Sequence, residues 1–257
     1  MVIDLTFLKK IAEVASQQTL PRFRTASLVD NKYQSGFDPV TEADREAERA
    51  IRALINDTFP EHGILGEEFG GENLDQPNVW VIDPIDGTRA FISGLPVWGT
   101  LAGLTVNGDA VAGLMSQPFT RELFMCDGEA SWYEGPDGTR RLQTRKTTEL
   151  ADATLFTTTP ALFKDAQRES YDRVESSVRL ARYGTDCYAY AMLASGFVDL
   201  VIETGLHPYD IVALIPIIEK AGGVFTTWDG GPAEKAGDIV AAATPELHSK
   251  ALAMLNR

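Results

Sequence analysis

The sequence predicts a mixed α/β fold in which a single domain spans residues 1–257. Three observations support this: apolar residues at helical spacing near the N-terminus, an Asn107-Gly108 dipeptide between two strand-like runs, and strand-like segments that alternate with helical ones beyond about residue 150. They divide the chain into an N-terminal α+β region, residues 1–148, and a C-terminal α/β region, residues 149–257. No polar linker separates the two regions, so we expect one compact unit.

Two helices are predicted first. Apolar residues recur at helical spacing from Leu5 to Ala15, and Pro21 closes this segment. The second helix begins at Thr41, where Asp44 completes a capping box, and runs to the stop at Pro60.

Short apolar runs bounded by turn residues then predict strands in the N-terminal sheet. The Asn107-Gly108 dipeptide joins the last two of them, and because this pair favours a tight hairpin, part of the sheet is expected to be antiparallel. Residues 131–141 are rich in turn formers and predict another hairpin end or a loop. The runs are residues 64–65, 79–82, 101–106 and 110–115.

The C-terminal region alternates between the two kinds of element. Pro216 lies inside one predicted helix, where it should kink the helix or be compensated by packing. The predicted strands are residues 155–159, 178–181, 198–202, 224–227 and 239–242, and the predicted helices are about residues 161–176, 186–195, 210–221 and 245–256.

The acidic composition excludes several function classes. Lys and Arg number 23 against 37 Asp and Glu, a formal net charge of -14, which disfavours binding to nucleic acid or to an anionic membrane. Any phosphate must therefore be reached with the help of cations. The longest apolar run, residues 211–218, is too short to span a membrane. No signal peptide is visible, and Cys126 and Cys187 fit free thiols in a reducing compartment, so we expect a cytoplasmic protein.

The most informative stretch runs from Val79 to Thr88. Four apolar residues predict a strand buried on both faces, and Pro84 should end it, which places Asp83 at a carboxyl end where α/β sheets bind ligands. Asp86 follows one turn later, so two carboxylates face one small volume beside a possible helix start. This arrangement suits a divalent hard cation that carries a phosphate. The alternative is a plain Asx-turn with a helix cap, but a cap does not need two acids behind a buried strand.

Three further acids have structural explanations that suffice when each is taken alone. Glu67 follows another short apolar run, and an exposed acidic loop explains it equally well. Asp210 precedes the helical run that begins at Ile211, where an acid favours the helix start. Asp44 is accounted for as the capping-box acid.

Taken together and in this order, the motifs resemble those of the inositol monophosphatase family of metal-dependent, lithium-sensitive phosphatases. The resemblance covers nearly the whole chain and implies a layered αβαβα sandwich and a homodimer. The motifs are Thr41-Glu42-Ala43-Asp44, Gly66-Glu67-Glu68, Asp83-Pro84-Ile85-Asp86-Gly87-Thr88, and Tyr209-Asp210 before Glu219-Lys220-Ala221-Gly222-Gly223.

The resemblance also implies roles for the site residues. Two or three Mg²⁺ ions would be held by carboxylates and one carbonyl. Asp44 and Thr88 would orient waters and assist protonation of the leaving oxygen, with Glu67 as a further catalytic side chain, and the amides of Gly87 and Thr88 would hold the phosphate. Metal-activated water would attack phosphorus in line, without a covalent enzyme intermediate. The implied metal ligands are Glu67, Asp83, Asp86, Asp210 and the Ile85 carbonyl.

Within the family, the continuation from Arg89 to Thr100 resembles the histidinol-phosphate phosphatase branch, which implies a role in histidine biosynthesis. Inositol-specific members typically carry Asn one position after Arg89. Arg89 itself either contacts the substrate or lies on a solvated helix face, and the second interpretation is slightly favoured.

The expected substrate wall adds a physical argument for this branch. It comprises Gly184, Thr185, Asp186 and Glu203. Asp186 stands where inositol-type members carry a small apolar residue, and two acids there would favour a substrate with an amino group. The alternative is that Asp186 simply caps the following helix.

We therefore expect a Mg²⁺-dependent phosphomonoesterase that acts on histidinol phosphate, a small phosphorylated metabolite. The alternative within the same family is an inositol-1-phosphate or broad small-alcohol phosphatase. A more remote alternative is a non-catalytic metal- or partner-binding protein that keeps the fold, which the complete set of carboxylates disfavours. The sequence lacks a phosphate-binding Gly-x-x-x-x-Gly-Lys loop, a nucleophile elbow and the Cys-x5-Arg spacing of thiol phosphatases.

Overall fold

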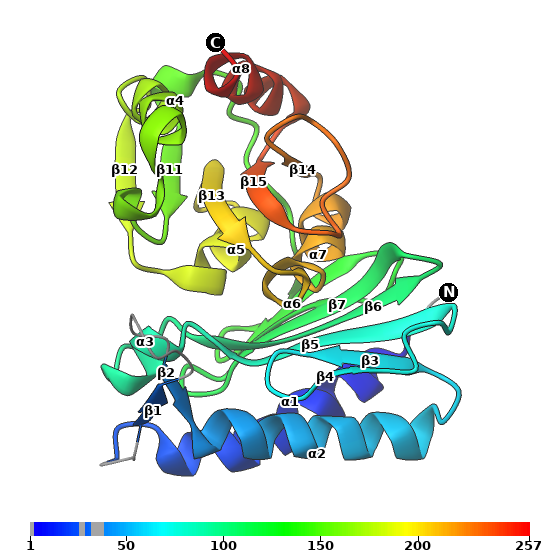
Figure 1. The fold of residues 1–257 in the computed structure, drawn as a ribbon. Coiled ribbons are helices and arrows are strands. Elements are labelled where there is room, and N and C mark those ends of the chain that lie inside the picture. The colour runs from blue at the N-terminus through cyan, green and yellow to red at the C-terminus, as the bar shows by residue number, and fades with distance from the viewer. Residues whose placement is uncertain (1–2, 26–28, 32–38) are drawn as a thin grey trace.

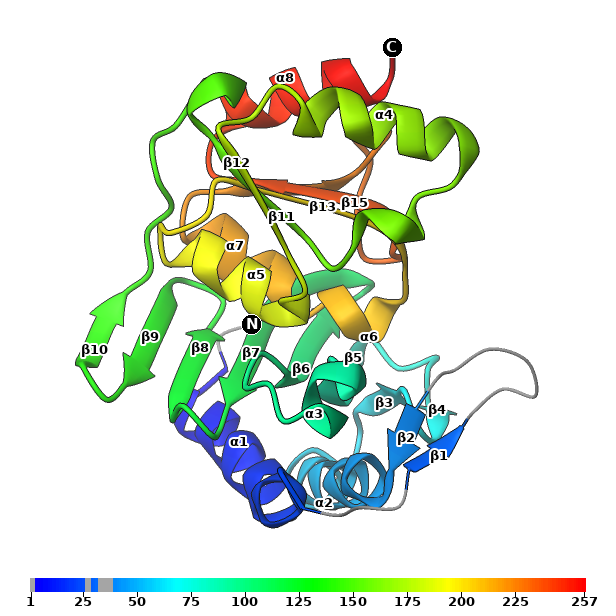
Figure 2. The same cartoon turned by 90° about the vertical axis from the view of Figure 1, so that its left-hand side faces the viewer.

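The computed structural model describes residues 3–25, 29–31 and 39–257. Its elements form five layers, an αβαβα sandwich, as expected (Figure 1). A helix pair covers the outer face of an eight-stranded sheet, three short helices lie between this sheet and a five-stranded sheet, and a second helix pair covers the far side (Figure 2). In the described part of the chain, no helix is both long and apolar enough to cross a membrane.

The first helix pair is α1 (Leu5–Thr19) and α2 (Glu42–Thr58). Thr41 caps α2, and its backbone N–H donates to Asp44 Oδ2 at 2.8 Å, which confirms the predicted capping box. The apolar faces of both helices pack on Trp80 and Ile82 of the sheet. A short 3₁₀ turn (Leu20–Arg22) and two paired strands, β1 (Val29–Asn31) and β2 (Pro39–Thr41), connect them.

The eight-stranded sheet has the order β10-β9-β8-β7-β6-β5-β3-β4, and its only parallel pair among the described strands is β3 with β5. Asn107 (φ 54°) and Gly108 (φ 95°) form the turn between β6 and β7, which confirms the hairpin. Residues 131–141 form another hairpin. The strands are β3 (Gly63–Gly66), β4 (Gly70–Glu72), β5 (Asn78–Asp86), β6 (Gly99–Val106), β7 (Asp109–Gln117), β8 (Glu122–Cys126), β9 (Ser131–Gly135) and β10 (Gly138–Arg141), and helix α3 spans Thr88–Ile92.

The five-stranded sheet has the order β12-β11-β13-β15-β14, with β11 parallel to both of its neighbours. Its strands are β11 (Thr154–Thr157), β12 (Leu180–Tyr183), β13 (Leu200–Leu206), β14 (Val224–Thr227) and β15 (Gly237–Ala242). Helices α4 (Asp165–Glu175) and α8 (Pro245–Leu255) form the outer layer, and α5 (Asp186–Ala194), α6 (Pro208–Ile211) and α7 (Leu214–Lys220) lie between the sheets. Two 3₁₀ turns, Leu150–Asp152 and Pro160–Leu162, complete the region, and the second delays the helix predicted from residue 161 until Asp165.

The prediction that Pro84 ends its strand and the prediction of one continuous helix over residues 210–221 are wrong, whereas the expected effect of Pro216 on that helix is found. Pro84 does not end its strand: β5 continues past an irregularity to Asp86, which pairs with Gly99, while the Pro84 carbonyl accepts a bond from the Thr100 hydroxyl at 2.8 Å. The helix predicted over residues 210–221 is instead divided into α6 and α7. Pro216 accounts for the break, because it has no N–H to donate to the carbonyl four residues earlier and its ring crowds that carbonyl.

The joint between α6 and α7 lies directly on the eight-stranded sheet. Gly103 and Gly113 face each other across β6 and β7. A methyl group built on Gly103 would come within 2.6 Å of the Ala213 nitrogen, and one built on Gly113 within 1.9 Å of the Ala213 carbonyl oxygen. Only glycine permits this approach, so the glycine pair fixes the height of the joint above the sheet, and with it the position of Asp210.

Candidate active site

Three carboxylates from different parts of the chain meet between the two sheets. Asp83 and Asp86 lie at the end of β5, and Asp210 lies in α6; one oxygen from each falls within 4.8 Å of the others. Local bonds orient them: Asp83 Oδ1 accepts from the Ile85 N–H at 3.0 Å, and Asp210 Oδ2 accepts from the His207 N–H at 2.7 Å. A set of carboxylate oxygens this close together suits a hard divalent cation.

The electrostatics of the cluster also favour a bound divalent cation. Burial is the main cause that raises the pKa of Asp83 well above its ordinary value, and the charges of Glu67, Asp86 and Asp210 raise it further. The pKa of Asp86 is also raised well above its usual range, first by burial and then by the neighbouring acids, against a 2.7 Å bond from the Cys187 N–H. A cation would relieve this repulsion, so the residues present fit a bound Mg²⁺.

Two other expected residues, Glu67 and Asp44, lie beside the cluster. Glu67 follows β3, and its side chain lies within hydrogen-bonding reach of the Asp83 carboxyl group. Asp44 is fully buried, and burial, with a further contribution from the charge of Glu67, raises its pKa to about 6. Glu67, Asp44 and Asp210, which the sequence taken one motif at a time explained as loop or cap residues, therefore lie close together in the structure.

Thr88 connects Asp44 to the β5 segment. Its hydroxyl lies 3.2 Å from the Ile85 carbonyl oxygen and makes a long contact of 3.5 Å with Asp44 Oδ1. Asp44 is thus both the capping-box acid and a partner of Thr88. The one hydroxyl therefore lies between a buried carboxylate and the carbonyl expected to bind metal.

The start of α5 lies over Gly87. Gly87 has a φ of 82°, and a methyl group built on it would meet Asp186 Oδ2 at 3.0 Å. The alternative that Asp186 is the N-cap of α5 does not hold: the capping position belongs to Thr185, and Asp186 is the first helical residue. Burial raises the pKa of Asp186 to about 6, while the charge of exposed Arg89 lowers it. Arg89 is therefore on a solvated surface and also close to Asp186.

A cavity of about 160 Å³ opens from the carboxylate cluster toward the five-stranded sheet. Glu203 of β13 is buried in its wall, where it accepts bonds from the Thr158 N–H at 2.6 Å and the Thr158 hydroxyl at 2.7 Å. Burial nevertheless raises the pKa of Glu203 to about 7. The described residues that line the cavity are Asp86, Thr158, Leu162, Asp186, Cys187, Tyr190, Glu203, Leu206 and Asp210.

Gly184 and Thr185, the other expected wall residues, do not line this cavity. Gly184 is exposed and has a φ of 77°, and its N–H donates to the Thr158 carbonyl at 2.9 Å. It therefore ties the start of α5 to the end of β11. Thr158 and Tyr190 are the residues that sequence reasoning missed, although Tyr190 lies four residues after Asp186, on the same side of α5.

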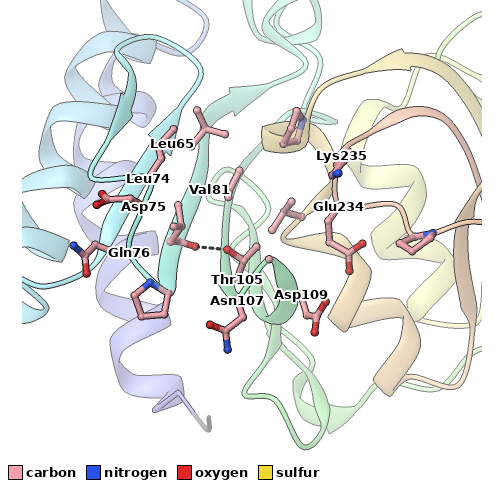
Figure 3. A pocket seen from close by; sticks show the side chains of 16 residues that line it. Leu65, Leu74, Asp75, Gln76, Val81, Thr105, Asn107, Asp109, Glu234 and Lys235 are labelled. Carbon is pink, nitrogen blue, oxygen red and sulfur yellow. Dashed lines mark hydrogen bonds between the residues drawn. The ribbon is translucent and has the colours of Figure 1, made fainter.

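A larger cavity, about 930 Å³, lies elsewhere (Figure 3). Its walls come from β3, β5, the turn between β6 and β7, α6 and the segment around Glu234 and Lys235. The carboxylates of the cluster are outside this lining, whereas Asp86 and Asp210 line the smaller cavity, which is therefore the candidate active site.

Comparisons with known proteins place the chain in a family. Residues 4–257 match the inositol monophosphatase family. The chloroplastic bifunctional phosphatase IMPL2 of Arabidopsis thaliana is 43% identical over 231 residues, which are 85% of this chain and 66% of that protein. The histidinol-phosphatase of Mycobacterium tuberculosis is 33% identical over 98% of both chains. A solved structure of an inositol monophosphatase from Zymomonas mobilis superposes with a TM-score of 0.87 and 36% identity, over 99% of this chain and 98% of that one. With its sandwich fold and clustered carboxylates, the chain belongs to the inositol monophosphatase family of metal-dependent phosphatases.

Proposed function

We propose that this protein is a Mg²⁺-dependent phosphomonoesterase that hydrolyses histidinol phosphate to histidinol and phosphate. The observation that carries the proposal is the pair of acids, half-buried Asp186 and buried Glu203, in the wall of the cavity that also contains Asp86 and Asp210. A buried carboxylate attracts a positive charge strongly because water does not screen it. Histidinol phosphate offers an ammonium group there, and inositol phosphate does not.

In this proposal, the Mg²⁺ ions are held by Glu67, Asp83, Asp86, Asp210 and the carbonyl of Ile85. When bound, they would polarise the phosphate and lower the pKa of water. The amides of Gly87 and Thr88 hold the phosphate oxygens at the start of α3.

Side chains of the protein would transfer protons and orient the water and the substrate. Thr88, between the Ile85 carbonyl and Asp44, orients a water through its hydroxyl. The raised pKa of Asp44 allows it to take up and return a proton near neutral pH. Asp186 and Glu203 hold the amino group of the alcohol, and Arg89, Gly184 and Thr185 complete the rim of the site.

The experiment measures phosphate release from histidinol phosphate, inositol 1-phosphate and fructose 1,6-bisphosphate with Mg²⁺, with EDTA and with lithium. We expect histidinol phosphate to have the highest kcat/KM, EDTA to abolish turnover and lithium to inhibit it. Faster hydrolysis of inositol 1-phosphate would make the inositol-phosphate alternative the correct one. Turnover that survives EDTA would overturn the metal mechanism.

A matched pair of variants tests the substrate wall. Asp186→Asn keeps the size of the side chain and removes its charge, so KM for histidinol phosphate should rise while kinetics with inositol 1-phosphate change little. Asp172→Asn, in the outer helix α4, is the control and should alter neither. Equal losses on both substrates for Asp186→Asn would contradict a role in recognising the amino group.

We also propose that the protein is a homodimer in the cytoplasm, as the family resemblance implies. Sedimentation equilibrium at micromolar concentration measures the mass directly, and a monomer there would contradict the first part.

A further inference from the structure

One polar side-chain group in the cavity wall makes no hydrogen bond with the described residues. The hydroxyl of Tyr190 is buried, and within the described part of the chain it has no hydrogen-bond partner. A buried polar group without a partner costs free energy, so an unpaired hydroxyl beside a binding cavity indicates a partner that arrives with the ligand.

The ring that carries this hydroxyl is held firmly. Tyr190 stacks on Phe225 with ring centroids 5.5 Å apart and an interplanar angle of 23°. It lies one helical turn after Asp186 and Cys187, and all three residues line the cavity. The phenol is therefore held in the cavity wall, close to the charges of Glu203, Asp86 and Asp210, and loses little further side-chain freedom on binding.

The other polar groups in the described lining are acceptors or are already engaged. Asp86, Asp186, Glu203 and Asp210 offer carboxylate oxygens. The hydroxyl of Thr158 already donates to Glu203 at 2.7 Å. The thiol of Cys187 bonds to Asp86.

Burial, together with the charges of Glu203, Asp86 and Asp210, raises the pKa of Tyr190 well above its ordinary value, so the phenol keeps its proton at neutral pH. Tyr190 is thus the free side-chain donor of this lining.

We propose that the Tyr190 hydroxyl donates a hydrogen bond to an uncharged acceptor atom on the alcohol half of the substrate, and so selects substrates that carry such an atom beyond the amino group. This rests on the proposed function and deepens it. The acids bind the ammonium group, and Tyr190 recognises the uncharged acceptor atom. A neutral imidazole nitrogen is an acceptor of the required kind.

The test combines one variant with two substrates. Tyr190→Phe removes only the hydroxyl and keeps the ring on Phe225. The substrates are histidinol phosphate and phenylalaninol phosphate, which has the same amino alcohol but a phenyl ring without an acceptor. For the first substrate we expect kcat/KM to fall roughly tenfold, mainly through KM, since that is about the value of one buried hydrogen bond. For the second we expect less than about a twofold change. Equal losses on both substrates would overturn the proposal.

A binding and a stability measurement exclude a merely structural role. Titration calorimetry with L-histidinol should show weaker binding to Tyr190→Phe, and with phenylalaninol unchanged binding. The melting temperature of the unliganded variant should stay the same or rise, because the lost hydroxyl had no partner. The control is Tyr171→Phe, which removes a buried hydroxyl that donates to Glu175 at 2.9 Å; it should lower the melting temperature and leave the kinetics unchanged. A melting temperature for Tyr190→Phe that falls as far as that of the control would also overturn the proposal.

The two proposals fail separately. If the wild-type protein hydrolyses inositol 1-phosphate and not histidinol phosphate, the proposed function is wrong, and the same variant is then compared on inositol 1-phosphate and phenyl phosphate. Inositol offers hydroxyl oxygens as acceptors, and phenol offers none beyond the ester. An unchanged ratio of kcat/KM values there would overturn the role of Tyr190 itself.

Discussion

Replacing Glu203 by glutamine should change how stability depends on pH. Burial raises the pKa of Glu203 from 4.5 to about 7. Because the pKa in the folded protein is above that in the unfolded chain, the stabilising contribution is fully present below pH 4.5 and is lost as pH rises through 7. The whole effect is about 3 kcal/mol, and about 2.5 kcal/mol of it disappears between pH 5 and pH 8. Little discount for screening applies, since Glu203 is only 5% exposed.

Glutamine retains an oxygen that can accept both bonds from Thr158 but cannot ionise. The free energy of unfolding is measured by urea titration in EDTA at pH 5 and pH 8 for both proteins. Between these pH values, the variant should gain about 2.5 kcal/mol relative to the wild type, or roughly 5–10 °C in melting temperature. Glu61→Gln, at an exposed glutamate, is the control and should show no such gain. If the difference between Glu203→Gln and the wild type does not depend on pH, the burial argument for Glu203 is refuted.

Three further changes test the metal site and its support. Asp83→Asn should lower activity by more than the roughly 10–100-fold that loss of an outer partner costs, and should abolish the rise in melting temperature on adding Mg²⁺; a rise equal to that of the wild type would contradict the ligand role. Gly113→Ala, which brings a methyl group within 1.9 Å of the Ala213 oxygen, should displace α6 and weaken Mg²⁺ binding in calorimetry. Gly108→Ala, in open space at a φ of 95°, should cost about 1 kcal/mol of stability without that effect. Thr88→Val should lower kcat with KM nearly unchanged, and Thr88→Ser should restore it; a serine variant as slow as valine would rule out the hydroxyl as the active group.

The sequence could predict features that depend on neighbouring residues. The Asn107-Gly108 turn and the capping box at Thr41 are local, since a dihedral preference or a bond three residues away decides each of them. Pro84 is a case in which local sequence preferences did not predict the end of a strand. Its missing N–H interrupts the ladder, but the pairing of Asp86 with Gly99 resumes the strand, and that pairing depends on the position of β6.

The composition of the site could be predicted only in part. Spacing alone brought Asp83 and Asp86 together, because they are three positions apart in the chain. Asp210 comes from a distant segment, and only the family resemblance joined it to the pair before the fold brought it within 4.8 Å. Tyr190 gave no signal beyond its helical spacing from Asp186, since a tyrosine on a buried helix face is usually part of the core. Its unpaired hydroxyl is visible only once the surrounding atoms are placed.

The acid excess of the chain takes on a specific meaning at this site. Glu67, Asp83, Asp86 and Asp210 would place four negative charges in a partly buried volume if all were ionised. The raised pKa values of Asp83 and Asp86 mean that, without a cation, the cluster retains protons and offers fewer oxygen ligands. Two Mg²⁺ ions balance four carboxylates, and a third makes the site positive. In the proposed mechanism, a protein with a net charge of -14 therefore accepts a phosphate ester at this place only with metal bound. Acids disfavour nucleic acid on the rest of the surface, and here they would bind phosphate through the metal.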